Sequence, residues 1–108
     1  MFSHTPQTIA KQYSLLGQFC VPGIQGKFEV RSHNGRKTRP LLIVVHESWE
    51  KASRRERVAP VSVVELEANG EQHQLQQDEA LPGVNTQRFD FSQMALEFFH
   101  HNHPAQFA

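Results

Sequence analysis

The chain has little cysteine, no long apolar run and no leader-like segment, and each scarcity excludes a class of protein. Its single cysteine, Cys20, cannot form a disulfide within the chain, which is typical of a reducing compartment. The longest apolar run, LLIVV at 41–45, is far shorter than the roughly 20 residues of a membrane-spanning helix. The N-terminus has no basic segment followed by an apolar stretch, as a secretory signal would. We therefore expect a cytoplasmic protein that does not act at a membrane.

The charged fraction is also small, and it argues against a disordered chain. Charged residues make up 20% of the 108 residues, whereas eight Phe, one Trp and one Tyr supply bulky material for a core. This length suits one hydrophobic core and is too short for two. We expect residues 1–108 to form a single globular domain.

Helical spacing begins and ends the chain. Ile9, Tyr13, Leu16 and Phe19/Cys20 recur every three or four residues, which predicts an N-terminal helix over 5–20. At the other end, Asp90 stands three residues before Gln93, a capping-box arrangement. We expect a C-terminal helix from about this point, with an apolar face of Phe91, Met94, Ala95 and Phe98. Ser48 as N-cap and the arginines of 51–57 predict a short central helix at 49–57.

Two Asn-Gly pairs predict β-hairpins between these helices. Asn34-Gly35 and Asn69-Gly70 each suit a type I′ turn, in which both central residues have positive φ. The run at 41–45 is apolar on both faces and indicates a central strand, with Pro40 at its start. We predict an α+β fold with a mainly antiparallel sheet of about four strands.

Charge is divided unevenly along the chain although the net charge is zero. Residues 1–60 carry ten Lys/Arg against four Glu, a balance of +6, and residues 61–108 carry one Arg against seven acids, a balance of −6. Such asymmetry indicates a charged partner, or it is neutralised within the fold or across a dimer. The basic residues cluster on the first hairpin and on 51–57, a shape and charge that suit nucleic acid. The candidate contacts are Arg31, Arg36, Lys37, Arg39, Arg54 and Arg55.

Histidines are the candidates for metal binding. His100 and His103 are three residues apart and would share a helix face, with His46 as a third ligand if the fold brings it near. The simpler interpretation is that these imidazoles favour the negative end of a helix dipole. Cys20 has an apolar setting, so we expect it to be buried and unreactive.

Motifs of catalysis are scarce as well. The sequence contains no P-loop, no dinucleotide fingerprint and no recognisable catalytic pair, so we expect neither enzyme activity nor a cofactor, and no family is recognised. The leading hypothesis is a small non-enzymatic binding or accessory protein that acts through protein–protein contacts, with a homodimer as one form. The alternative is a nucleic-acid-binding regulator that uses the basic 31–39 hairpin and 51–57 segment. The third is a metal-dependent or enzymatic role at the C-terminal histidines.

Overall fold

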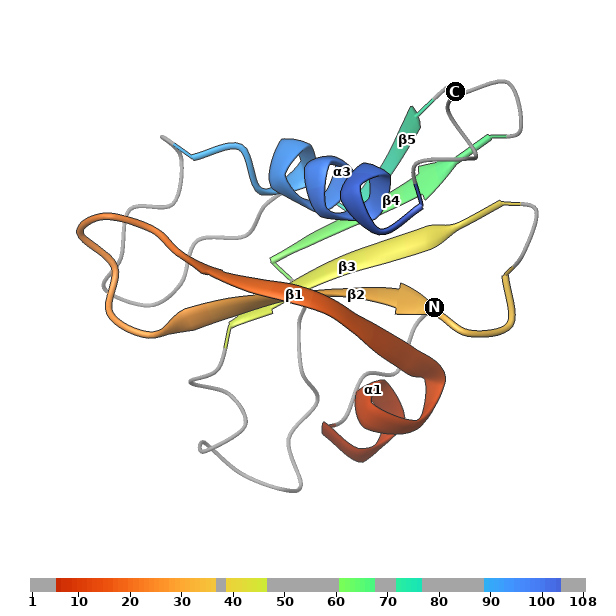
Figure 1. The fold of residues 1–108 in the computed structure, drawn as a ribbon, viewed down its shortest axis with the longest axis horizontal. Coiled ribbons are helices and arrows are strands. Elements are labelled where there is room, and N and C mark those ends of the chain that lie inside the picture. Colours follow the sequence, from red (N-terminus) through yellow and green to blue (C-terminus); the bar gives the residue numbers. More distant parts are fainter. Residues whose placement is uncertain (1–5, 37–38, 47–60, 68–71, 77–88, 104–108) are drawn as a thin grey trace.

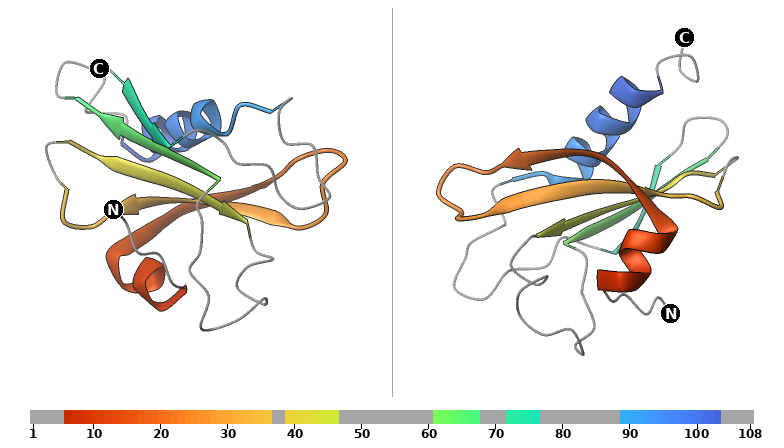
Figure 2. Two further views of the ribbon diagram at one scale, coloured as in Figure 1. Left: turned by 180° about the vertical axis from the view of Figure 1, so that it is seen from behind. Right: turned by 60° about the horizontal axis from the view of Figure 1, so that its bottom comes forward.

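The computed structural model describes residues 6–36, 39–46, 61–67, 72–76 and 89–103, where it shows an antiparallel sheet with a helix on each face (Figure 1). The strands are β1 (Tyr13–Cys20), β2 (Lys27–His33), β3 (Leu41–His46), β4 (Ser62–Leu66) and β5 (Gln72–Gln76). Helix α1 (Pro6–Gln12) lies on one side of the sheet and α3 (Phe91–Asn102) crosses the other (Figure 2). This is the expected α+β arrangement. Neither of these helices is long and apolar enough to span a membrane.

The middle strand is the most deeply buried element. Each strand pairs antiparallel with the next, in the order β1-β2-β3-β4-β5. All six residues of β3 are buried, which confirms that 41–45 is a central strand. Pro40 precedes it and has no amide hydrogen, but its carbonyl accepts a 2.9 Å hydrogen bond from Leu66 N–H.

Two apolar cores lie on the two faces of the sheet, because successive residues of β3 point to opposite sides. Leu42 and Val44 join the core under α3, together with Phe28 and Val30 of β2. Leu41, Ile43 and Val45 join the second core, which includes Ile9 of α1. The sheet is therefore covered on both faces along its centre.

The start of α3 confirms the predicted cap. Asp90 is the N-cap, and its carboxylate accepts a 2.9 Å hydrogen bond from Gln93 N–H. The buried face differs from the prediction: Phe91, Ala95, Leu96 and Phe99 are buried, whereas Met94 and Phe98 are only partly covered. The row Phe91–Ala95–Phe99 follows the i, i+4 ridge that packs onto the sheet.

The prediction of one helix over 5–20 is wrong in its second half. The helix ends at Gln12, and the next eight residues form β1, so the described sheet has five strands instead of about four. A β-bulge explains the misleading spacing, because the pairing with β2 skips Leu16 between Leu15 and Gly17. Tyr13 therefore packs in the core under α1, whereas Leu16 and Phe19 pack against the core under α3. The apolar residues lie on two faces of a bulged strand and not on one face of a helix.

The first Asn-Gly turn also differs from the prediction. The only residues with positive φ in the described part of the chain are Gly23 and Gly26, so Asn34-Gly35 is not a type I′ turn. The pairing of β2 with β3 ends at Ser32↔Leu42, which leaves a longer connection than a two-residue turn. Asn34 instead binds the α1–β1 junction: its N–H donates to Gln12 O at 2.8 Å and its Nδ2 to Lys11 O at 3.2 Å. These bonds hold the loop against β1.

Two further predictions fall outside the described residues. Strands β4 and β5 pair antiparallel, with Leu66 opposite Gln72, but Asn69-Gly70 between them is not described, so its turn type stays a prediction. The central helix expected at 49–57 also lies outside the described ranges.

Gly17 is required by the close approach of α3 to β1. A Cβ at this position would overlap Cε1 and Cδ1 of the Phe98 ring. We expect Gly17→Ala to lower the free energy of unfolding by about 1–3 kcal/mol, because the half-buried ring must shift. Denaturant unfolding of Gly17→Ala, Phe98→Ala and the double variant measures this. The alanine should cost much less in the Phe98→Ala background, and an equal cost in both backgrounds would contradict the clash.

Candidate functional site

Four ionic side chains contact one another: two of the β2–β3 loop, one of β4 and one of the residue that follows β4. Arg36 Nη1 pairs with Glu65 Oε2, and Arg39 Nη2 pairs with Glu67 Oε1 and also lies 3.4 Å from Glu65 Oε1. The fold places them together because Leu41 pairs with Glu65 across β3 and β4. We refer to Arg36, Arg39, Glu65 and Glu67 as the charge cluster. Within it, cations of the basic half of the chain meet acids of the acidic half.

Of the remaining candidate contacts for nucleic acid, the one that the structure describes is also paired with an acid. Arg31 Nε lies 3.4 Å from Glu29 Oε1, and its Nη1 donates to Tyr13 O at 3.2 Å. Lys37, Arg54 and Arg55 lie outside the described residues. Each described candidate therefore has an acidic partner within the chain, and none of the three is a free cation.

The three C-terminal histidines lie exposed at the end of α3. The His103 N–H donates to Phe99 O at 2.9 Å, and its ring lies 4.6 Å from the Phe99 ring, centroid to centroid. His100 and His101 are in the last turn of the helix, where a partial positive charge is favourable. In the described part of the chain no three His, Cys, Asp or Glu side chains are grouped as a metal would require.

His46 is far from these histidines. It is buried at the end of β3, where Nε2 lies 2.8 Å from Gln25 O and the ring meets Phe28 edge-on. Phe28 packs against Phe91 at the N-terminal end of α3, whereas His103 follows the C-terminal end. A helix of this length spans about 18 Å, so the fold does not bring His46 to His103 as a third ligand.

Strand β1 forms one edge of the sheet, and four of its eight residues are exposed. The strand YSLLGQFC has no charged residue and no proline, although edge strands commonly carry both as protection against pairing. Leu15 is 47% exposed and is the one large apolar side chain exposed in the described ranges. Cys20 at its end is exposed too, which corrects the expectation of a buried thiol.

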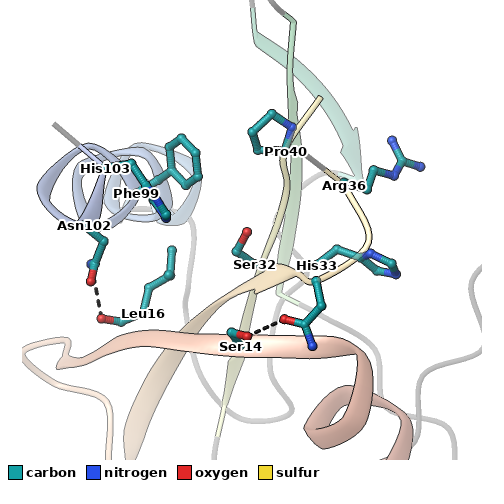
Figure 3. Close-up of a pocket in the computed structure, with 10 residues that line it drawn as sticks. Ser14, Leu16, Ser32, His33, Arg36, Pro40, Phe99, Asn102 and His103 are labelled. Carbon is teal, nitrogen blue, oxygen red and sulfur yellow. Dashed lines mark hydrogen bonds between the residues drawn. The ribbon is translucent and has the colours of Figure 1, made fainter. Parts of the chain in front are cut away.

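The bulge in β1 is anchored by α3. Leu16, the unpaired residue, accepts a 3.3 Å hydrogen bond at its carbonyl from Nδ2 of Asn102 (Figure 3). The same amide donates to Phe98 O at 2.7 Å and so closes the last turn of the helix. Beside this contact is an open pocket of about 440 Å³ between β1, β2, the β2–β3 loop and the end of α3. Its polar residues, such as Ser14 and Ser32, have no sequence signal and were not predicted.

Tyr13 is buried in the core under α1, within range of the positive charge of Arg36, and provides a probe of that core. Burial raises the pKa of its phenol above the ordinary value of 10.0, and the positive charge of Arg36 partly offsets this. The folded state therefore favours the neutral phenol. This contribution to stability is complete below pH 10.0 and is lost as the pH rises through the raised pKa.

The chain has one tyrosine, so the pH-dependent change in phenolate absorbance reports on Tyr13 alone. We expect the midpoint of this titration above 10.0 in the folded protein and near 10.0 in denaturant. Arg36→Gln should raise the folded midpoint further, because it removes the charge that lowers it. A folded midpoint at or below the denatured one would show that Tyr13 is not in a desolvated site.

Comparisons with protein-family models, with curated proteins and with solved structures find no match.

Proposed function

We propose that this chain is a small non-enzymatic binding protein that acts through protein–protein contacts at the outer edge of β1. The observation that carries the proposal is the lack of any charge on an eight-residue edge strand. The carbonyls of Tyr13 and Leu16 accept from Arg31 and Asn102. Along the rest of the strand, backbone groups that point away from β2 can pair with an added strand.

A second copy of the chain is the partner that fits this edge best. Two β1 strands can pair antiparallel about a two-fold axis, which gives a closed dimer with the same surface on both subunits. Neither strand brings a charge, so no repulsion opposes the pairing. The exposed Leu15 and the partly buried Leu16 and Phe19 supply apolar area beside the new hydrogen bonds.

The nucleic-acid alternative has weaker support in the described residues. Arg31, Arg36 and Arg39 would have to release Glu29, Glu65 and Glu67 before they could neutralise phosphates. The charge cluster also weakens the case for association between the basic and acidic halves of two chains. Two cations of the basic half and two acids of the acidic half already pair within one chain. Association through β1 should therefore persist in salt, whereas association between charged poles should weaken.

The substitution Leu15→Lys tests the proposal, because it places a like charge on each of the two strands that would pair. We expect sedimentation velocity to show a concentration-dependent dimer of the wild type at low and high salt. The variant should weaken dimerisation at least about tenfold. Gln93→Lys is the matched control, since it adds the same charge at an exposed position of α3.

Three outcomes would contradict the proposal. A wild-type protein that stays monomeric at every concentration has no β1 pairing. A dimer that dissociates in salt is held by charge and not by the edge. Equal weakening of dimerisation by Leu15→Lys and Gln93→Lys would show that the added charge lowers the affinity wherever it is placed on the surface.

A further inference from the structure

The first Asn-Gly pair of the chain lies in an exposed turn after β2. The turn closes with a 3.4 Å hydrogen bond from Arg36 N–H to His33 O. Asn34 and Gly35, the two residues between them, are exposed to solvent. Asparagine before glycine is the sequence most prone to deamidation, because glycine has no side chain to hinder attack of its nitrogen on the preceding side-chain amide. The rate of that reaction depends on the groups that the fold places around the pair.

The backbone nitrogen of Gly35 has a base as its hydrogen-bond partner. Its N–H donates to Nδ1 of His33 at 3.1 Å, so this nitrogen of the neutral imidazole is unprotonated and can accept the proton. The ring makes an edge-on contact with the buried Tyr13, with ring centroids 4.9 Å apart, which fixes its position. An imidazole within hydrogen-bond distance of the proton to be removed meets the geometric requirement for a general base.

The side-chain amide of Asn34 is bound at both ends. Its Oδ1 accepts a hydrogen bond from Ser14 Oγ, the dashed line at Ser14 in Figure 3, and its Nδ2 donates to Lys11 O at 3.2 Å. Attack on Cγ places negative charge on Oδ1, and a hydroxyl that already donates to this oxygen stabilises that charge. The two bonds also restrain the side chain, but exposed hydrogen bonds are weak beside the about 10²–10⁴-fold effect of a positioned base.

The reaction needs no reactant other than water. Gly35 N attacks Asn34 Cγ while its proton passes to His33 Nδ1. The bond from Cγ to Nδ2 then breaks, and the departing nitrogen takes up that proton and leaves as ammonia. Water opens the resulting cyclic imide, which leaves an aspartate or an isoaspartate in place of the asparagine.

The product cannot make the contacts that Asn34 makes. A carboxylate has no N–H to donate, so one of its oxygens would face Lys11 O in the former place of Nδ2. The backbone N–H of Asn34 also donates to Gln12 O at 2.8 Å, so this one residue joins the β2–β3 loop to the end of α1. Loss of the amide therefore weakens the attachment of the loop to the α1–β1 junction.

We propose that Asn34 is a self-modifying site. In the folded chain it deamidates with His33 as the base and Ser14 as the donor to the oxyanion, and the product releases the β2–β3 loop from the α1–β1 junction. This goes beyond the proposed protein contact, because the reaction needs neither a second copy nor the pairing of strands.

The test follows both Asn-Gly pairs of the full chain during incubation at neutral pH, with peptide mass spectrometry to measure the acid formed at positions 34 and 69. We expect position 34 to convert at least roughly tenfold faster in the folded chain than in denaturant, where the contacts with His33 and Ser14 are lost. A rate at position 34 that is no higher in the folded chain than in denaturant would overturn the proposal, because the hydrogen bonds would then protect the amide.

Variants identify the groups responsible. His33→Gln should slow conversion at position 34 of the folded chain by roughly tenfold, because glutamine has no basic nitrogen. Ser14→Ala should slow it by a smaller factor, since it removes only the donor to Oδ1. His101→Gln is the matched control, because it removes an exposed histidine of α3, and Asn69 is the reference within every sample. Equal rates at position 34 in His33→Gln and His101→Gln would overturn the role of His33.

Asn34→Asp, which introduces one of the two products directly, tests the consequence. We expect the amide of residue 34, which bonds to Gln12 O, to exchange at least roughly tenfold faster in this variant, with no change in the amides of Leu41–His46. Asn69→Asp adds the same charge elsewhere and should leave the amide of residue 34 unchanged. Equal protection of this amide in Asn34→Asp and the wild type would show that the loop stays attached, which would overturn the release.

Discussion

Burial of β3 on both faces is the constraint on which the rest of the described structure depends. Its side chains alternate between two cores, and each fully buried aliphatic side chain contributes about 1.5–3 kcal/mol relative to exposure. Such a strand requires a neighbour on each side and a layer on each face. Strands β2 and β4, with α1 and α3, supply these, and the sheet then ends at β1 and β5. The position of the open edge is a consequence of the central strand.

The same constraint arranges the charges. Because β3 must pair with β4, Glu65 comes to lie opposite Leu41 at the end of the basic loop. Arg36 and Arg39 then find their acidic partners within the chain. The uneven division of charge along the sequence is thus partly cancelled in the fold. The uncharged edge of β1 is the surface on which the proposed pairing depends.

Sequence reasoning identified elements whose signals are local and missed those that depend on register. The apolar run of β3 and the Asp90 cap are contiguous patterns, and both predictions are confirmed. Strand β1 was mistaken for helix because the bulge at Leu16 gives its apolar residues a spacing of three. The turn at Asn34 depends on bonds to Lys11 and Gln12, far away in the sequence. The pocket serines become neighbours only through the pairing of β1 with β2.

Hydrogen exchange of the β1 amides at two protein concentrations tests the central claim, that β1 is an open edge which a second copy covers. The account predicts that those amides of Tyr13–Cys20 that point away from β2 exchange faster in the dilute protein and become protected in the concentrated one. Amides of Leu41–His46 should be equally slow at both concentrations, since β3 is buried in either state. Exchange in β1 that does not change with concentration, or protection that appears instead around Arg36 and Arg39, would contradict the account.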